Sequence, residues 1–194
     1  MIEKGFLKNI LRSKQTVFTF KDLLLMWAGV DAKTARVRIN YYVQRGELVP
    51  IRRGIYAKDT NYDRFELATK IYTPAYISFE TILGNAGVTF QYYSQIFVAS
   101  YQTKEIVADN QRIVFRTLKN TILTDSAGID HKDFYDAASP ERAFLDVVYL
   151  HKEYYFDQLS HLNWDKVYEI LPIYGKNLKM RDRVSRYHQI AREL

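Results

Sequence analysis

The sequence of 194 residues predicts an α+β fold in two parts. Residues 31–57 read as a helix followed by two short strands, and the chain after residue 58 combines apolar helical segments with strand-like runs. Charge divides at the same place, since residues 1–57 hold 11 Lys and Arg against 4 Asp and Glu, whereas residues 58–169 hold 11 against 16. We therefore expect two domains, residues 1–58 and residues 59–194.

Two helices are expected before residue 31. The segment from Glu3 to about Arg12 carries apolar side chains at helical spacing. Thr19 is followed three residues later by Asp22, and this pair predicts a capping box at the start of the second helix. Gly29 then suits a sharp turn into the next element.

The helix expected over residues 32–45 is the most informative element. Asp31 suits its N-cap because the carboxylate can accept hydrogen bonds from the first turn, and Gly46 suits its end. The stripe expected to be buried consists of Ala32, Ala35, Ile39, Tyr42 and Val43. The opposite face carries Lys33, Thr34, Val37, Asn40, Tyr41 and Gln44, with Arg36 and Arg38 at its two sides.

Two short strands should follow this helix. Residues 48–51 form the first, in which Pro50 is tolerated only at a sheet edge or a bulge. Arg52, Arg53 and Gly54 then make a tight connection to the return strand, residues 55–57. Three helices followed by a two-stranded hairpin are the order of a winged helix-turn-helix, which is the fold we expect for the N-terminal domain.

The side chains of this helix and hairpin are typical of a surface that binds duplex DNA. Asn and Gln amides can pair with adenine edges, Val and Thr methyl groups suit a thymine methyl, and flanking cations suit phosphates. No acid lies between Asp31 and Glu47, although a merely solvated helix, which is the alternative, more often mixes Glu with Lys. The expected DNA-binding residues are Lys33, Thr34, Arg36, Val37, Arg38, Asn40, Tyr41, Gln44, Arg52 and Arg53.

The second part reads as a mixed domain of helices and strands. Its expected elements are a helix over 62–72, a helix over 79–85 capped by Ser78, strands over 93–101, 105–108 and 111–118 with a further strand over 121–124, and helices over 140–151, 164–171 and 177–193. The Ser139-Pro140 start of the helix over 140–151 is interpreted as architecture, with Pro at the first helical position. Arg142 is expected to pair with Asp146, its i+4 neighbour.

The last helix adds a possible secondary basic surface, made of Lys176, Lys179, Arg181, Arg183 and Arg186. This surface could be solvated, extend the DNA contact, or bind RNA or an acidic protein, and the sequence does not choose among these. The 16 Tyr and 11 Phe residues fall mostly at core periodicity, which favours packing over stacking on RNA.

Several classes of function are not expected. The chain has no Cys, which excludes disulfides, thiol catalysis and cysteine-based zinc sites. It has no apolar run of membrane-spanning length and no secretory signal layout, so we expect a cytoplasmic protein with no membrane partner. Asp130 and His131, with Asp133 and Asp136, match no metal spacing, so no metal, cofactor or catalytic residue is expected.

Three segments give the chain a resemblance to the AbiEi-type antitoxins of type IV abortive-infection toxin–antitoxin systems. These segments are I-R-R-G-I-Y-A at 51–57, Y-I-S-F-E-T-I-L-G-N-A-G-V at 76–88 and A-A-S-P-E-R-A-F-L-D-V-V at 137–148. The resemblance implies a winged helix-turn-helix that represses its own operon and a C-terminal domain that counters a nucleotidyltransferase-like toxin. Many members carry His where this chain has Phe79 and Asn85.

The expected partners are therefore double-stranded operator DNA, on which a homodimer could form, and a cognate nucleotidyltransferase-like toxin. A winged-helix regulator whose second domain binds a ligand or dimerises is the alternative. An enzyme of nucleic-acid metabolism is a third reading, and it would require a catalytic activity that depends on Asp130, His131 or Asp133.

Overall fold

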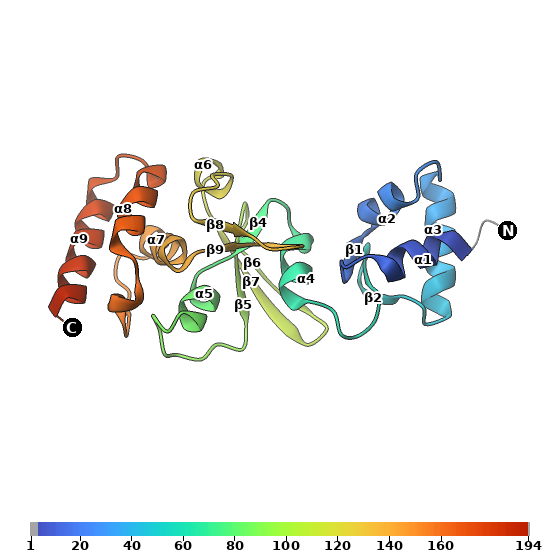
Figure 1. Ribbon diagram of the computed structural model, residues 1–194, viewed down its shortest axis with the longest axis horizontal. Coiled ribbons are helices and arrows are strands. Elements are labelled where there is room, and N and C mark those ends of the chain that lie inside the picture. The colour runs from blue at the N-terminus through green and yellow to red at the C-terminus, as the bar shows by residue number, and fades with distance from the viewer. Residues whose placement is uncertain (1–3, 194) are drawn as a thin grey trace. The chain divides into compact units, whose positions relative to one another are not determined.

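A computed structural model describes residues 4–193 and divides the chain into two compact units between Ile71 and Tyr72 (Figure 1). Both units combine helices with a sheet, so the predicted α+β class is confirmed. Glu3, the expected start of the first helix, lies outside the described residues.

The first unit contains four helices and three strands within its described part. In chain order they are α1 (Lys4–Arg12), β1 (Val17–Thr19), α2 (Phe20–Met26), α3 (Ala32–Gln44), β2 (Val49–Arg52), β3 (Ile55–Ala57) and α4 (Arg64–Ile71). The predicted capping box is present, because Thr19 Oγ1 accepts a hydrogen bond from Asp22 N while Asp22 Oδ2 accepts one from Thr19 N. Phe18, Trp27 and Tyr42 are the largest buried side chains of a core shared by the helices and the sheet.

The sheet of the first unit has three antiparallel strands in the order β1-β3-β2, not the two expected from the sequence. β1 was missed because it is only three residues long and runs directly into the capping box of α2. β2 is an edge strand with a register shift between Pro50 and Arg52. This position explains how the strand tolerates Pro50, which cannot donate a ladder hydrogen bond.

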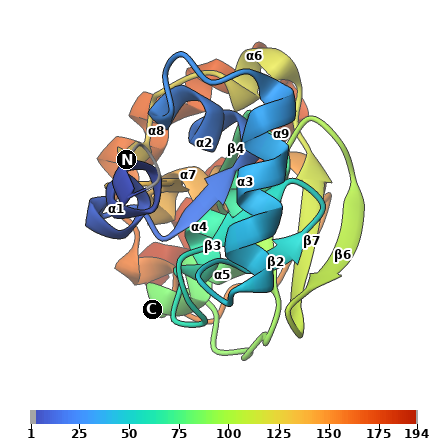
Figure 2. The same ribbon diagram turned by 90° about the vertical axis from the view of Figure 1, so that its right-hand side faces the viewer.

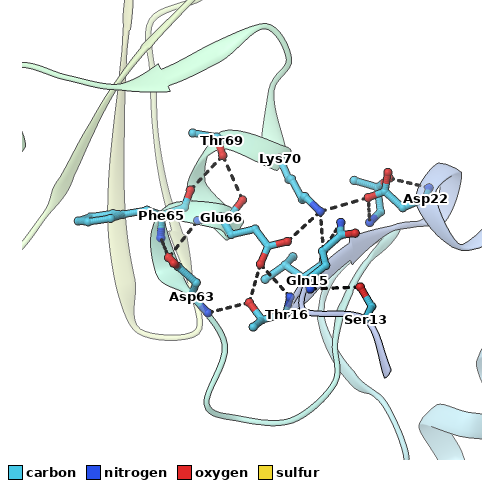
Figure 3. A network of polar contacts seen from close by, with 11 residues as sticks. Ser13, Gln15, Thr16, Asp22, Asp63, Phe65, Glu66, Thr69 and Lys70 are labelled. Carbon is cyan, nitrogen blue, oxygen red and sulfur yellow. Dashed lines mark hydrogen bonds and ion pairs between the residues drawn. The ribbon is translucent and has the colours of Figure 1, made fainter. Parts of the chain in front are cut away.

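A buried polar network attaches α4 to the first unit (Figure 3). The Glu66 side chain is fully buried, and its Oε2 accepts hydrogen bonds from Thr16 N at 2.9 Å and Thr16 Oγ1 at 2.6 Å. Lys70 Nζ lies 3.0 Å from Glu66 Oε1, donates to Val17 O at 2.6 Å and lies 3.4 Å from Asp22 Oδ2. The compact unit therefore continues through α4, and the boundary expected at residue 58 moves to residues 71 and 72.

The second unit is built on a six-stranded mixed sheet. Its elements are β4 (Ala75–Ile77), α5 (Glu80–Asn85), β5 (Ile96–Ser100), β6 (Lys104–Ala108), β7 (Gln111–Thr117), α6 (Asn120–Leu123), β8 (Ile129–His131), β9 (Asp136–Ala138), α7 (Pro140–Leu150), the 3-10 turns η1 (Leu159–His161) and η2 (Leu171–Tyr174), α8 (Trp164–Ile170) and α9 (Leu178–Glu193). The strand order is β6-β7-β5-β4-β9-β8, in which the β4–β9 and β5–β7 pairs are parallel. Figure 2 shows β6 and β7 side by side as the long hairpin at one edge.

Helix α7 is the centre of the second core. It contacts α5, α8 and α9, and Phe144, Leu145 and Val147 are fully buried there (Figure 1). Ser139 caps α7 by accepting a hydrogen bond from Arg142 N, with Pro140 in the first turn. The helix start is therefore architectural, as predicted.

The predicted Arg142–Asp146 pair is also present and fully buried, with Arg142 Nε 3.5 Å from Asp146 Oδ1. Tyr76, Ser78 and Tyr174 each donate a hydroxyl hydrogen bond to Asp146. Burial raises the pKa of Asp146, while Arg142 and these hydroxyl donors oppose that shift. The network joins β4, α7 and the η2 turn at the middle of the unit.

Two elements of the second unit differ from the expectation. Ser78 does not cap α5, because its hydroxyl is directed into the core at Asp146; Phe79 precedes the helix instead, with a φ of 55° and no side-chain cap. Residues 120–123 form helix α6, not a strand, and place Ile122 and Leu123 in the core. The strands β4, β8 and β9 were not predicted, since three residues are too few to show an alternating pattern.

Candidate nucleic-acid interface

Helix α3 presents a long polar face to solvent. Asp31 caps the helix by accepting hydrogen bonds from Lys33 N and Thr34 N, and Ala35, Ile39 and Tyr42 are buried, as predicted. The six exposed side chains of the helix that were expected to contact DNA are Lys33, Arg36, Val37, Asn40, Tyr41 and Gln44. These six residues, defined here as the α3 face, are therefore accessible to a ligand.

Thr34 has a different position from the rest of the predicted set. It is half-buried, and its hydroxyl donates to Asp31 Oδ2 at 2.6 Å. Hydrogen bonds from the Thr34 side chain and backbone lower the pKa of Asp31. The Thr34 hydroxyl thus serves the helix cap and is less available to a base than the sequence suggested.

A hollow of about 560 Å³ lies between α3 and the turn joining β2 to β3. We call it the β-turn hollow, and it is lined by Phe20, Arg36, Asn40, Arg53, Gly54 and Tyr56. The Arg36 guanidinium lies 4.8 Å from the centroid of the Phe20 ring, which holds this cation at the wall. The structure therefore brings Arg36 and Asn40 of the helix together with Arg53 of the turn.

The turn itself is fixed to the rest of the unit. Gly54 has a φ of 78°, a conformation that favours glycine, and its carbonyl accepts a hydrogen bond from Phe20 N at 2.8 Å. Arg52 and Arg53 are both exposed on this turn. Two cations are consequently presented beside the α3 face by a turn that is anchored to the start of α2.

Arg38 is not placed as expected. Its guanidinium lies 4.3 Å from the centroid of the Phe6 ring, and the residue is half-buried against α1. Position 38 lies beside the buried positions 35 and 39 on the helix surface, and Phe6 of α1 packs against it. The sequence alone could not show this, because the packing of α1 decides which flank of α3 is covered.

A second hollow of about 500 Å³ opens on the α1 side of α3, and Arg45 is the residue there that sequence reasoning missed. Arg45 Nε lies 3.0 Å from Glu47 Oε1, and Arg45 Nη1 donates to the Tyr41 hydroxyl at 3.1 Å. Its guanidinium also lies 5.4 Å from the Tyr41 ring centroid. Arg45 therefore orients Tyr41 on the α3 face. Its position directly after Gln44, the last helix residue of the predicted DNA-binding face, was the only available signal.

Residues 6–57 match the model of a family described as transcriptional regulator, AbiEi antitoxin. The resemblance to the AbiEi-type family is thereby confirmed for residues 6–57, which include the segment at 51–57, whereas the segments at 76–88 and 137–148 lie outside the match. The matched residues contain α2, α3, β2 and β3, which carry the exposed cations and amides described above. The match does not extend into the second unit, and no curated protein matches the chain.

The secondary basic surface lies in the second unit, outside the residues that match the AbiEi family model. Lys179, Arg181, Arg183 and Arg186 are on α9, and Lys176 precedes the helix. All are exposed except Arg183, which is half-buried and donates through Nη2 to Val148 O at 2.9 Å. The basic residues of α9 therefore do not form one uniform solvated face.

The acidic group around His131 lies on the β8–β9 hairpin. His131 Nδ1 is 2.7 Å from Asp136 Oδ1, and Lys132 Nζ is 3.5 Å from Asp130 Oδ2, all at exposed or partly exposed positions. Among residues 4–193, no group of three or more His, Cys, Asp or Glu side chains is arranged to hold a metal ion. Within the same range, no helix is both long and apolar enough to cross a membrane.

Proposed function

We propose that the first unit is a winged helix-turn-helix that binds duplex operator DNA, and that the protein is an antitoxin that represses its own operon. The observation that supports this most directly is the β-turn hollow, where Arg36, Asn40 and Arg53 converge from two elements. In this proposal α3 enters the major groove and the β2–β3 hairpin is the wing that contacts the sugar–phosphate backbone.

The side chains of the α3 face take different roles. Asn40 and Gln44 provide amides that can pair bidentately with adenine, and Val37 provides a methyl surface for thymine. Arg36, Arg52 and Arg53 bind phosphates, which fix the register of the protein on the duplex without reading its sequence. Lys33 adds a further exposed cation at the start of the helix.

The test is binding of the full chain to a DNA fragment from its own promoter, measured by fluorescence anisotropy at several salt concentrations. If the four exposed cations of the helix and wing neutralise about four phosphates, log K should fall against log salt with a slope of roughly −3 to −4. The double variant Arg36→Ala/Arg53→Ala should weaken binding strongly. The matched variant Lys8→Ala/Arg12→Ala removes two exposed cations of α1 and should have a small effect. A flat salt response, or equal losses in both variants, would contradict the proposed interface.

The second unit is proposed to counter a nucleotidyltransferase-like toxin encoded beside this protein. Support comes from the family match of the first unit and from the second unit's separate core. Co-expression with the neighbouring gene, scored for growth, tests it. Rescue that survives Arg36→Ala/Arg53→Ala would show that the toxin is countered apart from transcriptional repression.

A transcriptional regulator whose second unit binds a ligand or dimerises is the second candidate, because the family match is confined to residues 6–57. This candidate predicts operator binding with no growth rescue by the full chain. Co-expression therefore separates the two functions, while DNA binding is common to both.

A further inference from the structure

The second unit carries a groove of about 510 Å³ between the segment that follows α7 and helix α9. Three cations, Lys152, Arg183 and Arg186, and three aromatic rings, Tyr154, Tyr155 and Tyr187, line it. Its volume lies in the range of sites that hold small molecules, about 300–1,000 Å³. We call it the α9 groove.

Hydrogen bonds fix the walls of the α9 groove. The Tyr187 hydroxyl donates to Tyr154 O at 2.8 Å and accepts from Tyr154 N at 3.1 Å, so the segment after α7 is held against α9. Arg183 Nη2 donates to Val148 O near the end of α7, while Arg183 Nε is buried without a hydrogen-bond partner. The groove is therefore a built feature whose wall retains an unsatisfied donor.

The charge of the α9 groove contrasts with the rest of the unit. Residues 72–169 hold 8 Lys and Arg against 13 Asp and Glu, whereas residues 170–194 hold 6 Lys and Arg against 2 Asp and Glu. Lys152 and Arg186 are both exposed, and neither forms a salt bridge with an acid among residues 4–193. Two free cations beside the partly satisfied Arg183 favour an anionic ligand.

An exposed ring lies beside these cations. The Tyr155 side chain is 81% exposed, although Tyr154 and Tyr187 in the same groove are half-buried. An aromatic face next to free cations is the combination that binds nucleotides, because the ring stacks on a base while the cations bind phosphate. We propose that the α9 groove binds a nucleotide, with its phosphates on Lys152 and Arg186 and its base on Tyr155.

The other classes of anion fit this groove less well. An acidic peptide would use the cations but would leave the exposed Tyr155 ring without a role. Duplex DNA offers phosphates, but its bases are stacked on each other and are not available to a side-chain ring. Glu153, the acidic residue of the lining, can accept a hydrogen bond from a ribose hydroxyl or a base amino group. A free mononucleotide and the end of a single strand share this chemistry.

The experiment is isothermal titration calorimetry of the full chain with four probes: ATP, a short single-stranded RNA, duplex DNA and a polyglutamate peptide. Lys152→Ala/Arg186→Ala removes the phosphate contacts, and Tyr155→Ala removes the stacking face. Arg181→Ala/Arg192→Ala is the matched control, since helical spacing places these exposed cations on the other flank of α9. Arg183 is left intact because it also binds the end of α7.

We expect saturable binding of ATP or of single-stranded RNA, and the arm that binds identifies the source of the nucleotide. Binding should fall about tenfold or more in Lys152→Ala/Arg186→Ala and in Tyr155→Ala, be retained in Tyr155→Phe, and change less than about twofold in the control. The proposal does not depend on operator binding, because the groove lies wholly within the second unit.

Three results would overturn the proposal. The first is no saturable binding of either nucleotide probe. The second is an equal loss in the control variant, which would mean attraction by general charge. The third is a pattern in which the groove variants weaken only duplex or polyglutamate binding and Tyr155→Ala has no effect. Melting curves of all variants should coincide, because each changed side chain is exposed.

Discussion

The side chains of α3 separate into groups that structure alone distinguishes. Lys33, Arg36, Asn40 and Gln44 are exposed, whereas Arg38 stacks on Phe6 of α1. The exposed amides are expected to contact bases, and such contacts depend on the base sequence of the DNA. The exposed cations are expected to contact phosphates, which are the same in every sequence.

Asn40→Ala or Gln44→Ala should reduce the preference for operator over random DNA by about 1–3 kcal/mol if the altered amide pairs with a base. Arg52→Ala/Arg53→Ala should instead weaken binding to both DNAs alike. Anisotropy titrations with operator and scrambled duplexes at fixed salt measure both effects. The assignment of helix and wing would be wrong if the Arg variant changed only the preference.

His151 gives the second unit a pH dependence. Burial lowers the pKa of His151, the nearby charge of Arg116 acts in the same direction, and Glu80 opposes them. The unfolded chain therefore protonates His151 more readily than the folded chain does. The contribution of neutral His151 to folding stability is fully present above the ordinary His pKa of 6.5 and is lost as the pH falls below it. His151→Asn should therefore show a smaller drop in Tm between pH 7.5 and pH 5.5 than the unchanged protein. A full drop in His151→Asn would refute this cause.

At the scale of elements, α4 shows how polar contacts decide where a unit ends. Its apolar residues Leu67 and Ala68 are buried, but Glu66 and Lys70 determine what it packs on, through Thr16, Val17 and Asp22 (Figure 3). Removing α4 would take away both members of the Glu66–Lys70 pair and would leave the Thr16 amide and hydroxyl without their carboxylate acceptor.

Glu66→Ala should destabilise the first unit by about 3 kcal/mol or more, because it leaves the Thr16 amide without its acceptor and removes the buried carboxylate partner of Lys70, which keeps only Val17 O and Asp22 Oδ2. Urea unfolding followed by Trp27 fluorescence, in a Trp164→Phe background, reports on this unit separately. Glu47→Ala breaks the exposed pair with Arg45 and should cost no more than about 1 kcal/mol. If Glu66→Ala and Glu47→Ala lowered the free energy of unfolding by the same amount, the Glu66–Lys70 network would contribute no more to stability than an exposed ion pair.

At the scale of the whole molecule, the two units have separate cores and different net charges, since residues 1–71 hold 14 Lys and Arg against 7 Asp and Glu and residues 72–194 hold 14 against 15. The core of the first unit centres on Trp27 and Ile39, and that of the second on Phe144 and its neighbours. This division predicts that the activities can be separated by cutting the chain between residues 71 and 72.

The fragment of residues 1–71 should fold and bind operator DNA, and residues 72–194 should fold and keep the toxin-countering activity without binding that DNA. A fragment ending at residue 58 should melt at a lower temperature than 1–71, because it lacks Glu66 and Lys70. Thermal melts, anisotropy and growth rescue measure the three expectations. If residues 1–71 rescued growth and residues 72–194 did not, antitoxicity would act through transcription alone.

The sequence by itself determined the parts of this protein that depend on local interactions. The Thr19–Asp22 capping box, the Asp31 cap of α3 and the Ser139-Pro140 start of α7 were all predicted, because each motif satisfies its own backbone within a few residues. The Arg142–Asp146 pair was predicted for the same reason, since helical spacing places the two residues on one face.

Only the tertiary structure decided the features that join distant segments. β1 exists because β3 pairs with it, Ser78 bonds to Asp146 across the core and not to the helix that follows it, and α4 is held by Thr16, which lies 50 residues before Glu66. The same holds for function: which Arg side chains remain free depends on what packs beside them, so Arg36 and Arg53 meet in one hollow while Arg38 is covered by α1. Neither spacing nor composition encodes such contacts, because their partners are far apart in the chain.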